Sequence, residues 1–174
     1  PPGPIHPPVK DPVDCTTAPY HGRSLTEHLR RRRAALAPRL DEVYARTHGQ
    51  APTARLLVLG YPQLFPASRA EQACGSLGPT ARLGWSHAEQ DFLRRAVYET
   101  NRFIARRVAA SAIAEFVPVD GLFRGHEICG EAGAWINAVS LTLSPSPSID
   151  DQSFHPNEAG HRRGYAAAVN DVLN

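Results

Sequence analysis

The sequence predicts an α/β domain in which helices and buried strands alternate along the chain. Two capping boxes, SLTE at 24–27 and SHAE at 86–89, each open a segment of helical periodicity. Two short apolar runs, at 54–62 and 115–120, follow these helical segments. Continuous apolar runs of this length are typical of strands that are buried on both faces of a parallel sheet. Helices and strands that alternate in this way favour right-handed crossovers within one domain.

Length and composition indicate a single globular domain over residues 1–174. The 174 residues are 42% hydrophobic, which is enough for one core. The exception is the start, because six of the first twelve residues are prolines and 1–23 shows no periodicity. We expect 1–23 to be a proline-rich loop. The net charge of +2 is too small to indicate a nucleic-acid partner.

The first helix is expected to begin at Ser24 and to end at His48-Gly49. Apolar residues recur at helical spacing along this segment. Pro38 interrupts the pattern. Since proline removes one helical hydrogen bond and clashes with the preceding turn, we expect a kink or a new helical start there.

A second long helix is expected after the capping box at 86–89. Its apolar stripe consists of Ala88, Phe92, Ala96, Val97, Phe103, Ile104, Val108 and Ala112. The segment 141–152 carries turn residues and is expected to be a loop. A last helix is expected from about Pro156 to Leu173.

The most informative candidate residue is His155, which lies directly before Pro156. Because proline suits the first helical turn, His155 is expected at the N-cap or just before it. Such residues often point into the crevice at the carboxyl edge of a sheet, where ligands of α/β proteins bind. Catalysis and an ordinary surface histidine are both compatible with this position. Asp150 and Asp151 could orient the ring or could be solvated loop carboxylates.

Other candidate residues are weaker. The arginines at 30–33 fit a solvated helix face or, alternatively, a contact with anionic lipid or phosphate. His126 lies near Cys129 and fits a loop brace better than a catalytic or ligand role. The sequence contains no GxSxG elbow, phosphate-binding glycine loop or HExxH motif, so it offers no obvious nucleophile.

The three cysteines are Cys15, Cys74 and Cys129. None forms a CxxC pair, and no cysteine–histidine cluster has zinc spacing, so we expect neither a metal nor a cofactor. In an extracellular chain the odd count would leave one cysteine free or bonded to another chain. In a cytosolic chain all three would be scattered thiols.

Five segments follow one another in order between about residues 25 and 172: LLVLGYPQLFP, Cys74, LRRAVYETNRFIARRVA, VPVDGLFRGHEICGEAGAWIN and SFHPNEAGHRRGYAAAV. Together they resemble the SGNH (GDSL) hydrolases, especially the secreted actinobacterial lipases, esterases and phospholipases. The resemblance implies a flavodoxin-like three-layer α/β/α fold around a parallel sheet. It also implies a secreted, extracellular carboxylic ester hydrolase that acts on acyl esters or lipids.

By this resemblance, His155 is the general base, which activates a serine and then protonates the leaving alcohol. The usual acid of the family stands three residues before the histidine, where this chain has Gln152. The backbone carbonyl of Gln152 could accept the Nδ1–H bond instead and fix the ring tautomer. Asp151 is the side-chain alternative.

The family's Gly-Asp-Ser nucleophile segment and its Gly-x-Asn-Asp oxyanion segment are absent from this sequence. We therefore expect an N-terminal fragment of the same enzyme, carrying the serine, to accompany this chain after a cut before Pro1. The expected activity is that of a lipase or esterase. The alternatives are a phospholipase or acyltransferase on the same machinery, or a catalytically silent binding module.

The resemblance also implies how the cysteines pair. Cys74 and Cys129 are expected to form a disulfide that ties the loop after the first strand to the loop after Asp120. In the secreted relatives, a cysteine at the place of Cys15 bonds a short distance back along the chain. Cys15 is therefore expected to link this chain covalently to the N-terminal fragment.

Overall fold

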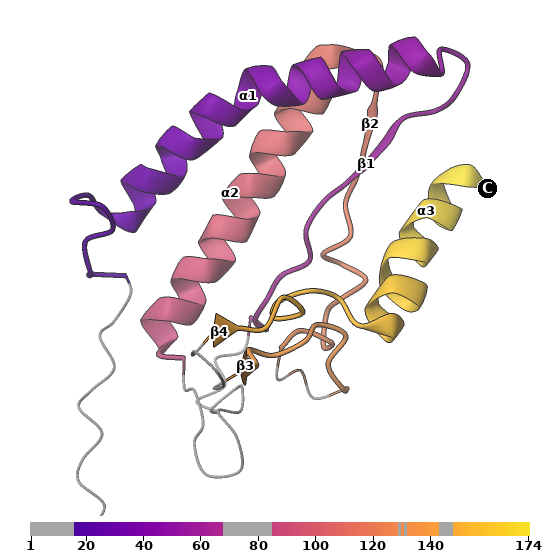
Figure 1. The fold of residues 1–174 in the computed structure, drawn as a ribbon. Helices are drawn as coiled ribbons and strands as arrows, with labels where there is room; N and C mark the ends of the chain where they lie inside the picture. Colours follow the sequence, from indigo (N-terminus) through magenta and orange to yellow (C-terminus); the bar gives the residue numbers. More distant parts are fainter. Residues whose placement is uncertain (1–15, 68–84, 129, 131, 143–147) are drawn as a thin grey trace, which may run out of the picture.

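In the described part of the chain, the fold is built from two long helices, two short strand pairs and a C-terminal helical run. The computed structural model describes residues 16–67, 85–128, 130, 132–142 and 148–174. In chain order these elements are α1 (Leu25–Gln50), β1 (Leu57–Leu59), α2 (His87–Ser111), β2 (Glu115–Val117), β3 (Leu141–Thr142), β4 (Ser148–Ile149), η1 (Gly160–Tyr165) and α3 (Ala166–Leu173) (Figure 1).

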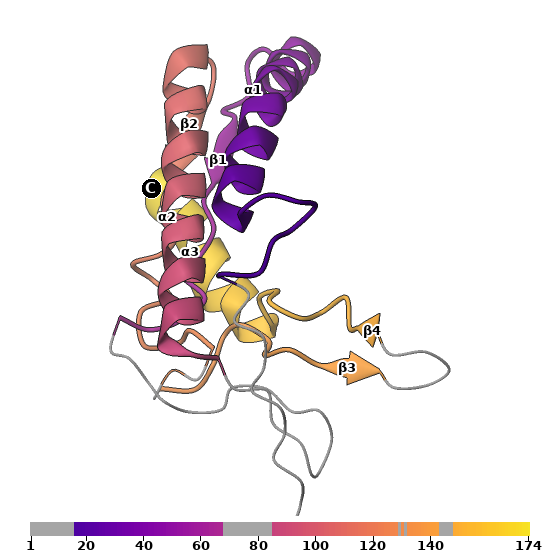
Figure 2. The same ribbon diagram turned by 90° about the vertical axis from the view of Figure 1, so that its left-hand side faces the viewer.

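The central feature is a parallel pair of strands between helices. β1 and β2 align Leu57 with Glu115 and Leu59 with Val117. α1 and α2 pack together on one side of this pair, and α3 lies on the other side (Figure 2). The prediction of an α/β fold with a parallel sheet is thereby confirmed.

Side chains of the two strands alternate between two apolar clusters. Val58 and Phe116 pack against the cluster around Tyr44, Ile104 and Val108, which α1 and α2 contribute. Their neighbours along each strand, Leu57, Leu59 and Val117, belong to the opposite cluster, which includes Ala168 of α3. Because both faces of the strands are covered, their residues are apolar except for Glu115 at the exposed start of β2.

Both capping boxes were predicted correctly as helix starts. The Ser24 hydroxyl accepts the Glu27 N–H at 3.2 Å. At the start of α2, the Ser86 hydroxyl accepts the Glu89 N–H, and the Glu89 carboxylate accepts the Ser86 N–H. Of the two alternatives predicted at Pro38, a kink or a new helical start, the new start is wrong, because α1 continues unbroken to Gln50. Proline removes a single helical bond, and the later half of α1 is held to α2 by the Asp41–Arg107 ion pair.

The expected loop at 141–152 contains the antiparallel strands β3 and β4, in which Leu141 aligns with Ile149. The last helix begins two residues after Pro156, at Glu158. The Asn157 side chain caps it, since its Oδ1 accepts the Gly160 N–H at 3.1 Å. The prediction that His155 stands at or just before the N-cap was therefore off by one residue.

The first part of the last helix is a π-helix, η1, rather than an α-helix. Two glycines allow it to lie directly against a buried ring. A Cβ at Gly164 would overlap the ring of Phe123, and one at Gly160 would overlap the carbonyl oxygen of Trp135. Short π segments occur frequently at functional sites.

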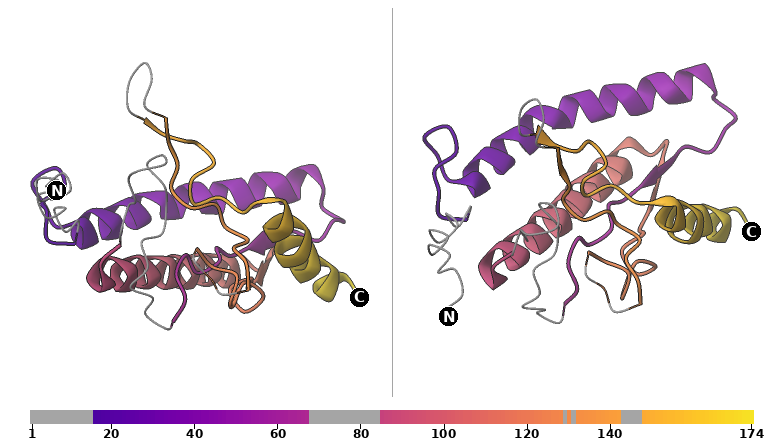
Figure 3. Two further views of the ribbon diagram at one scale, coloured as in Figure 1. Left: turned by 90° about the horizontal axis from the view of Figure 1, so that it is seen from below. Right: turned by 60° about the horizontal axis from the view of Figure 1, so that its bottom comes forward.

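The carboxyl ends of β1 and β2 point toward the end of the molecule at which α2 and the C-terminal helical run begin. Figure 3 turns this end of the molecule toward the viewer and shows the segments around β3 and β4 there. Crevices at the carboxyl edge of parallel strands are where ligands of open α/β sheets bind. The site described next lies at this edge.

Candidate active site

The segment after β1 is fixed by two backbone interactions. The Gly60 N–H donates to the Val117 carbonyl at 2.9 Å, which extends the pairing of the strands by one step. Asn101 of α2 then holds Tyr61 through both polar atoms of its amide: Oδ1 accepts the Tyr61 N–H and Nδ2 donates to the Tyr61 carbonyl, each at 2.8 Å. Asn101 was not singled out from the sequence. Its only signal was a polar residue beside the apolar stripe of α2.

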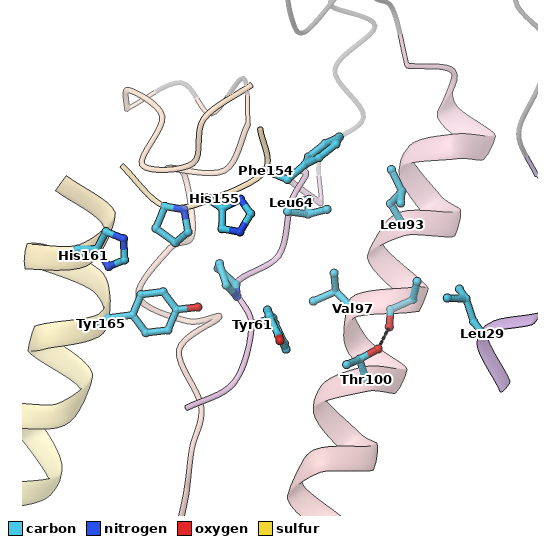
Figure 4. A pocket seen from close by; sticks show the side chains of 13 residues that line it. Leu29, Tyr61, Leu64, Leu93, Val97, Thr100, Phe154, His155, His161 and Tyr165 are labelled. Atoms are coloured by element: carbon cyan, nitrogen blue, oxygen red, sulfur yellow. Dashed lines mark hydrogen bonds between the residues drawn. The ribbon is translucent and has the colours of Figure 1, made fainter. Parts of the chain in front are cut away.

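A cavity of about 610 Å³ opens at this edge of the sheet. Its walls come from α1, the segment after β1, α2, the loop before the last helix, and η1 (Figure 4). Most of the wall is apolar, and its larger apolar side chains are Leu29, Leu64, Leu93, Val97 and Phe154. A mainly apolar cavity with few polar groups is typical of a site for a small or elongated apolar ligand.

His155 lies in the wall of this cavity, as Figure 4 shows. Its Nδ1 is 3.0 Å from the carbonyl oxygen of Ser153. A carbonyl oxygen can only accept a hydrogen bond, so the neutral ring carries its proton on Nδ1. Nε2 is then the unprotonated nitrogen, which is the form that a general base requires.

The group that orients His155 is one residue away from the one expected. The Gln152 carbonyl accepts the backbone N–H of His155 at 3.1 Å and does not contact Nδ1. Asp151 is exposed, and within the described part of the chain it forms no ion pair with His155. The physical reason is the tight turn from Asp150 to His155, which brings the next carbonyl, that of Ser153, under the ring.

Hydrogen bonds to the preceding segment fix the backbone on both sides of His155. The Phe154 N–H donates to the Asn137 carbonyl at 3.0 Å, and the Asn137 N–H donates to the His155 carbonyl at 2.9 Å. The buried Ser153 hydroxyl accepts the Ser140 N–H at 3.1 Å. The orienting carbonyl is therefore held from both sides.

Phe154 adopts a left-handed backbone conformation, with φ of +64°. This conformation is unfavourable for a residue with a side chain. Its ring lines the cavity and packs edge-on against Trp85, with the ring centres 5.8 Å apart. The two Asn137 backbone bonds and this ring contact hold the strained turn directly before His155.

Tyr165 and His161 of η1 also line the cavity, although neither was identified from the sequence. Their spacing of four residues is visible in the sequence, but the histidine-proline motif was the feature of this segment that indicated a site. The Tyr165 hydroxyl donates to the Gly60 carbonyl at 3.2 Å, joining η1 to the end of β1. Burial raises the pKa of Tyr165 to about 12, so the phenol keeps its proton and remains a donor.

His126, another candidate from the sequence, is not among the residues that line this cavity. The His126 ring stacks on Trp135 with centres 3.8 Å apart, and its Nδ1 lies 2.8 Å from the Gly133 carbonyl oxygen. These contacts are those of a loop brace. Cys15, Cys74 and Cys129 all lie outside the described residues, so both cysteine pairings stay predictions.

Neither a metal-binding cluster nor a helix that could span a membrane occurs in residues 16–67, 85–128, 130, 132–142 and 148–174. In those ranges no three His, Cys, Asp or Glu side chains are placed together as a metal site. No helix in the same ranges combines the length and the apolar character needed to cross a membrane.

Comparison with known proteins shows which proteins this chain is similar to. No protein-family model matches the chain. A lipase of Streptomyces rimosus is 30% identical over 137 residues, which are 79% of this chain and 44% of that protein. Lipase 2 of Streptomyces coelicolor is 31% identical over 154 residues, covering 88% of this chain and 46% of that protein. The similarity is to lipases.

Solved structures give the same result. The extracellular lipase of Streptomyces rimosus superposes with a TM-score of 0.62 at 27% identity, covering 91% of this chain and 61% of its own. Phospholipase A1 of Streptomyces albidoflavus superposes with a TM-score of 0.59 at 31% identity, covering 78% of this chain and 50% of its own. This chain spans about half the length of the curated lipases it matches.

Proposed function

We propose that this chain is part of a secreted serine ester hydrolase of the lipase or esterase type, in which His155 is the general base. The observation that carries the proposal is the bond from Nδ1 of His155 to the Ser153 carbonyl. It leaves Nε2 unprotonated in the wall of a largely apolar cavity. The similarity to streptomycete lipases supports an acyl ester as the substrate.

In the proposed reaction, Nε2 of His155 takes the proton from a serine hydroxyl while the serine oxygen bonds to the acyl carbon. The ester C–O bond then breaks, and the same nitrogen gives the proton to the leaving alcohol. Water repeats both steps and releases the acid. His155 thus carries one proton in each half-reaction, while the Ser153 carbonyl stabilises the protonated ring through Nδ1.

Two hydroxyl groups near the cavity in the described part of the chain are engaged elsewhere. Thr100 donates to the Ala96 carbonyl at 2.8 Å, and Ser153 bonds to Ser140. We therefore propose that a separate N-terminal segment supplies the serine and the oxyanion donors. Among the described residues, β1 pairs only with β2, so its other edge is available to a further parallel strand from that segment.

Cys15 is the proposed covalent link to that segment, and Cys74–Cys129 is the proposed disulfide within this chain. Secretion fits both bonds, because disulfides persist outside the cytosol. The Streptomyces rimosus relative is itself described as extracellular.

A phospholipase is the second candidate function. One structural relative is phospholipase A1 of Streptomyces albidoflavus, at 31% identity. The catalytic step is the same acyl transfer, and the two candidates differ in the alcohol that leaves. Parallel assays with triacylglycerol and with phosphatidylcholine separate them.

The function is tested by ester turnover in the protein purified from its native source and in two variants. We expect His155→Ala to lower kcat by at least about a hundredfold, because it removes the general base. Asp151→Asn is the matched control, since Asp151 is exposed on the same turn. We expect it to retain activity close to that of the parent. Equal losses in both variants would make Asp151 the orienting acid, and an active His155→Ala would remove the proposal.

A further inference from the structure

The four consecutive arginines at 30–33 divide into two pairs with different surroundings. Arg30 and Arg31 both bind Glu27, at 2.8 Å and 2.7 Å. Hydrogen bonds from Arg30 and then Arg31 lower the pKa of Glu27 to about 2. Since two arginines share one carboxylate, this half of the run is a partly neutralised helix surface.

Among the described residues, Arg32 and Arg33 have no such partner. Together with Arg39 they line a groove of about 280 Å³ along α1, here called the arginine groove. The three carboxylates of α1 are engaged elsewhere: Glu27 by Arg30 and Arg31, Asp41 by Arg107, and Glu42 by Arg46. Within the described residues, no ion pair neutralises the three groove arginines.

The same groove also presents apolar side chains. Leu29 and Leu36 line it between the arginines, and Leu36 is 43% exposed. Cationic and apolar side chains that alternate on one helix face fit the boundary between phosphates and acyl chains at a lipid surface. An acidic protein surface would satisfy the arginines but would leave Leu36 without an apolar partner.

The groove adjoins the cavity that contains His155. Leu29 and Thr100 line both, so the two spaces meet between α1 and α2. In Figure 4, Leu29 and Thr100 lie at the end of the cavity opposite His161 and Tyr165. A lipid surface against the groove would therefore lie next to the opening of the apolar cavity.

We propose that the arginine groove of α1 is a docking surface for an anionic lipid bilayer. Arg32, Arg33 and Arg39 would bind the lipid phosphates, and Leu36 would contact the beginning of the acyl chains. The inference concerns binding alone and does not depend on whether the chain hydrolyses esters. It assigns the unpaired half of the arginine run a role that the catalytic site does not use.

The test is co-sedimentation with vesicles of phosphatidylcholine alone and of phosphatidylcholine mixed with phosphatidylglycerol. We expect binding to the mixed vesicles only, and release at high salt, because salt screens the attraction. The variant Arg32→Gln/Arg33→Gln/Arg39→Gln should weaken binding by roughly a hundredfold, at about fivefold for each arginine. Leu36→Ser should weaken it further without changing the salt dependence.

The matched control is Arg30→Gln/Arg31→Gln/Arg46→Gln, which removes three charges from the same helix but only from arginines already paired with Glu27 or Glu42. We expect this variant to bind almost as the parent does. Equal weakening in both triple variants would show attraction to net charge and overturn the proposal. So would displacement of the parent from vesicles by low concentrations of inorganic phosphate, because the groove would then be a small-anion site. Failure of the parent to bind mixed vesicles would overturn it as well.

Discussion

The Nδ1 of His155 lies 3.0 Å from the carbonyl oxygen of Ser153, two residues earlier in the chain. A backbone carbonyl thus stands at Nδ1, the place that a carboxylate has in a serine–histidine–aspartate triad. Its position depends on the Ser153 side chain, which is bonded to Ser140, and on the left-handed turn at Phe154.

Ser153→Ala should weaken both the fold and the catalytic loop. The substitution removes the acceptor of the Ser140 N–H in a part-buried place, and we expect the unfolding free energy to fall by about 0.5–1.5 kcal/mol. We also expect kcat to fall more than KM changes, because the carbonyl under His155 loses its support. Urea denaturation and steady-state kinetics measure the two effects. Parent-like stability would show that the Ser153–Ser140 bond contributes nothing.

Gly164→Ala should destabilise the protein by about 1–3 kcal/mol, since the new Cβ would overlap the Phe123 ring. Gly49→Ala is the matched control in α1, where a Cβ meets nothing within 4 Å. There we expect a gain of about 0.5–1 kcal/mol, because glycine weakens a helix. Thermal unfolding of both variants decides the point. A neutral Gly164→Ala would mean that η1 does not lie against Phe123.

Alkaline pH should weaken the junction between η1 and β1. Tyr165 has a pKa of about 12 in the folded chain, whereas an unfolded tyrosine titrates near about 10. Below about pH 10 both forms are protonated and the contribution is fully present. Between these values only the unfolded form loses its proton, so the unfolding free energy should fall as pH rises.

Tyr165→Phe removes both the titrating group and the hydrogen bond to the Gly60 carbonyl. We expect a loss of about 0.5–1.5 kcal/mol at neutral pH and a shallower decline in alkali. Chemical denaturation at a series of pH values gives both quantities. Identical pH slopes for parent and variant would contradict the assignment to Tyr165.

Cys15 should join this chain to a smaller one in the native protein. A non-reducing gel is expected to show one band larger than 18.9 kDa, which a reductant divides into this chain and a smaller fragment. A band at the mass of this chain under both conditions would exclude the covalent link. Mapping of disulfide-linked peptides in the same sample tests Cys74–Cys129.

The helices and the central strands could be predicted because their signals are local. The SHAE box fixes the start of α2, and apolar runs covered on both faces mark β1 and β2. The unbroken course of α1 through Pro38 could not be predicted, because packing against α2 outweighs the loss of one helical bond. The hairpin of β3 and β4 was missed because each strand has only two residues.

The catalytic candidate itself was visible from the sequence, but its surroundings were not. His155 is marked by the proline that follows it. The orienting group was misplaced by one residue, because every residue carries a carbonyl and only the turn decides which one reaches Nδ1. Asn101 and Tyr165 act on the backbone of Tyr61 and Gly60, contacts that join residues 40 and 105 positions apart.

Labelling with a fluorophosphonate, which reacts with activated serines, tests the central claim most directly. The native protein would be labelled, digested and mapped by mass spectrometry, alongside the same protein carrying His155→Ala. The account predicts one labelled serine, on a segment outside this sequence, and loss of the label in the His155 variant. A labelled serine within residues 1–174, or undiminished labelling without His155, would contradict it.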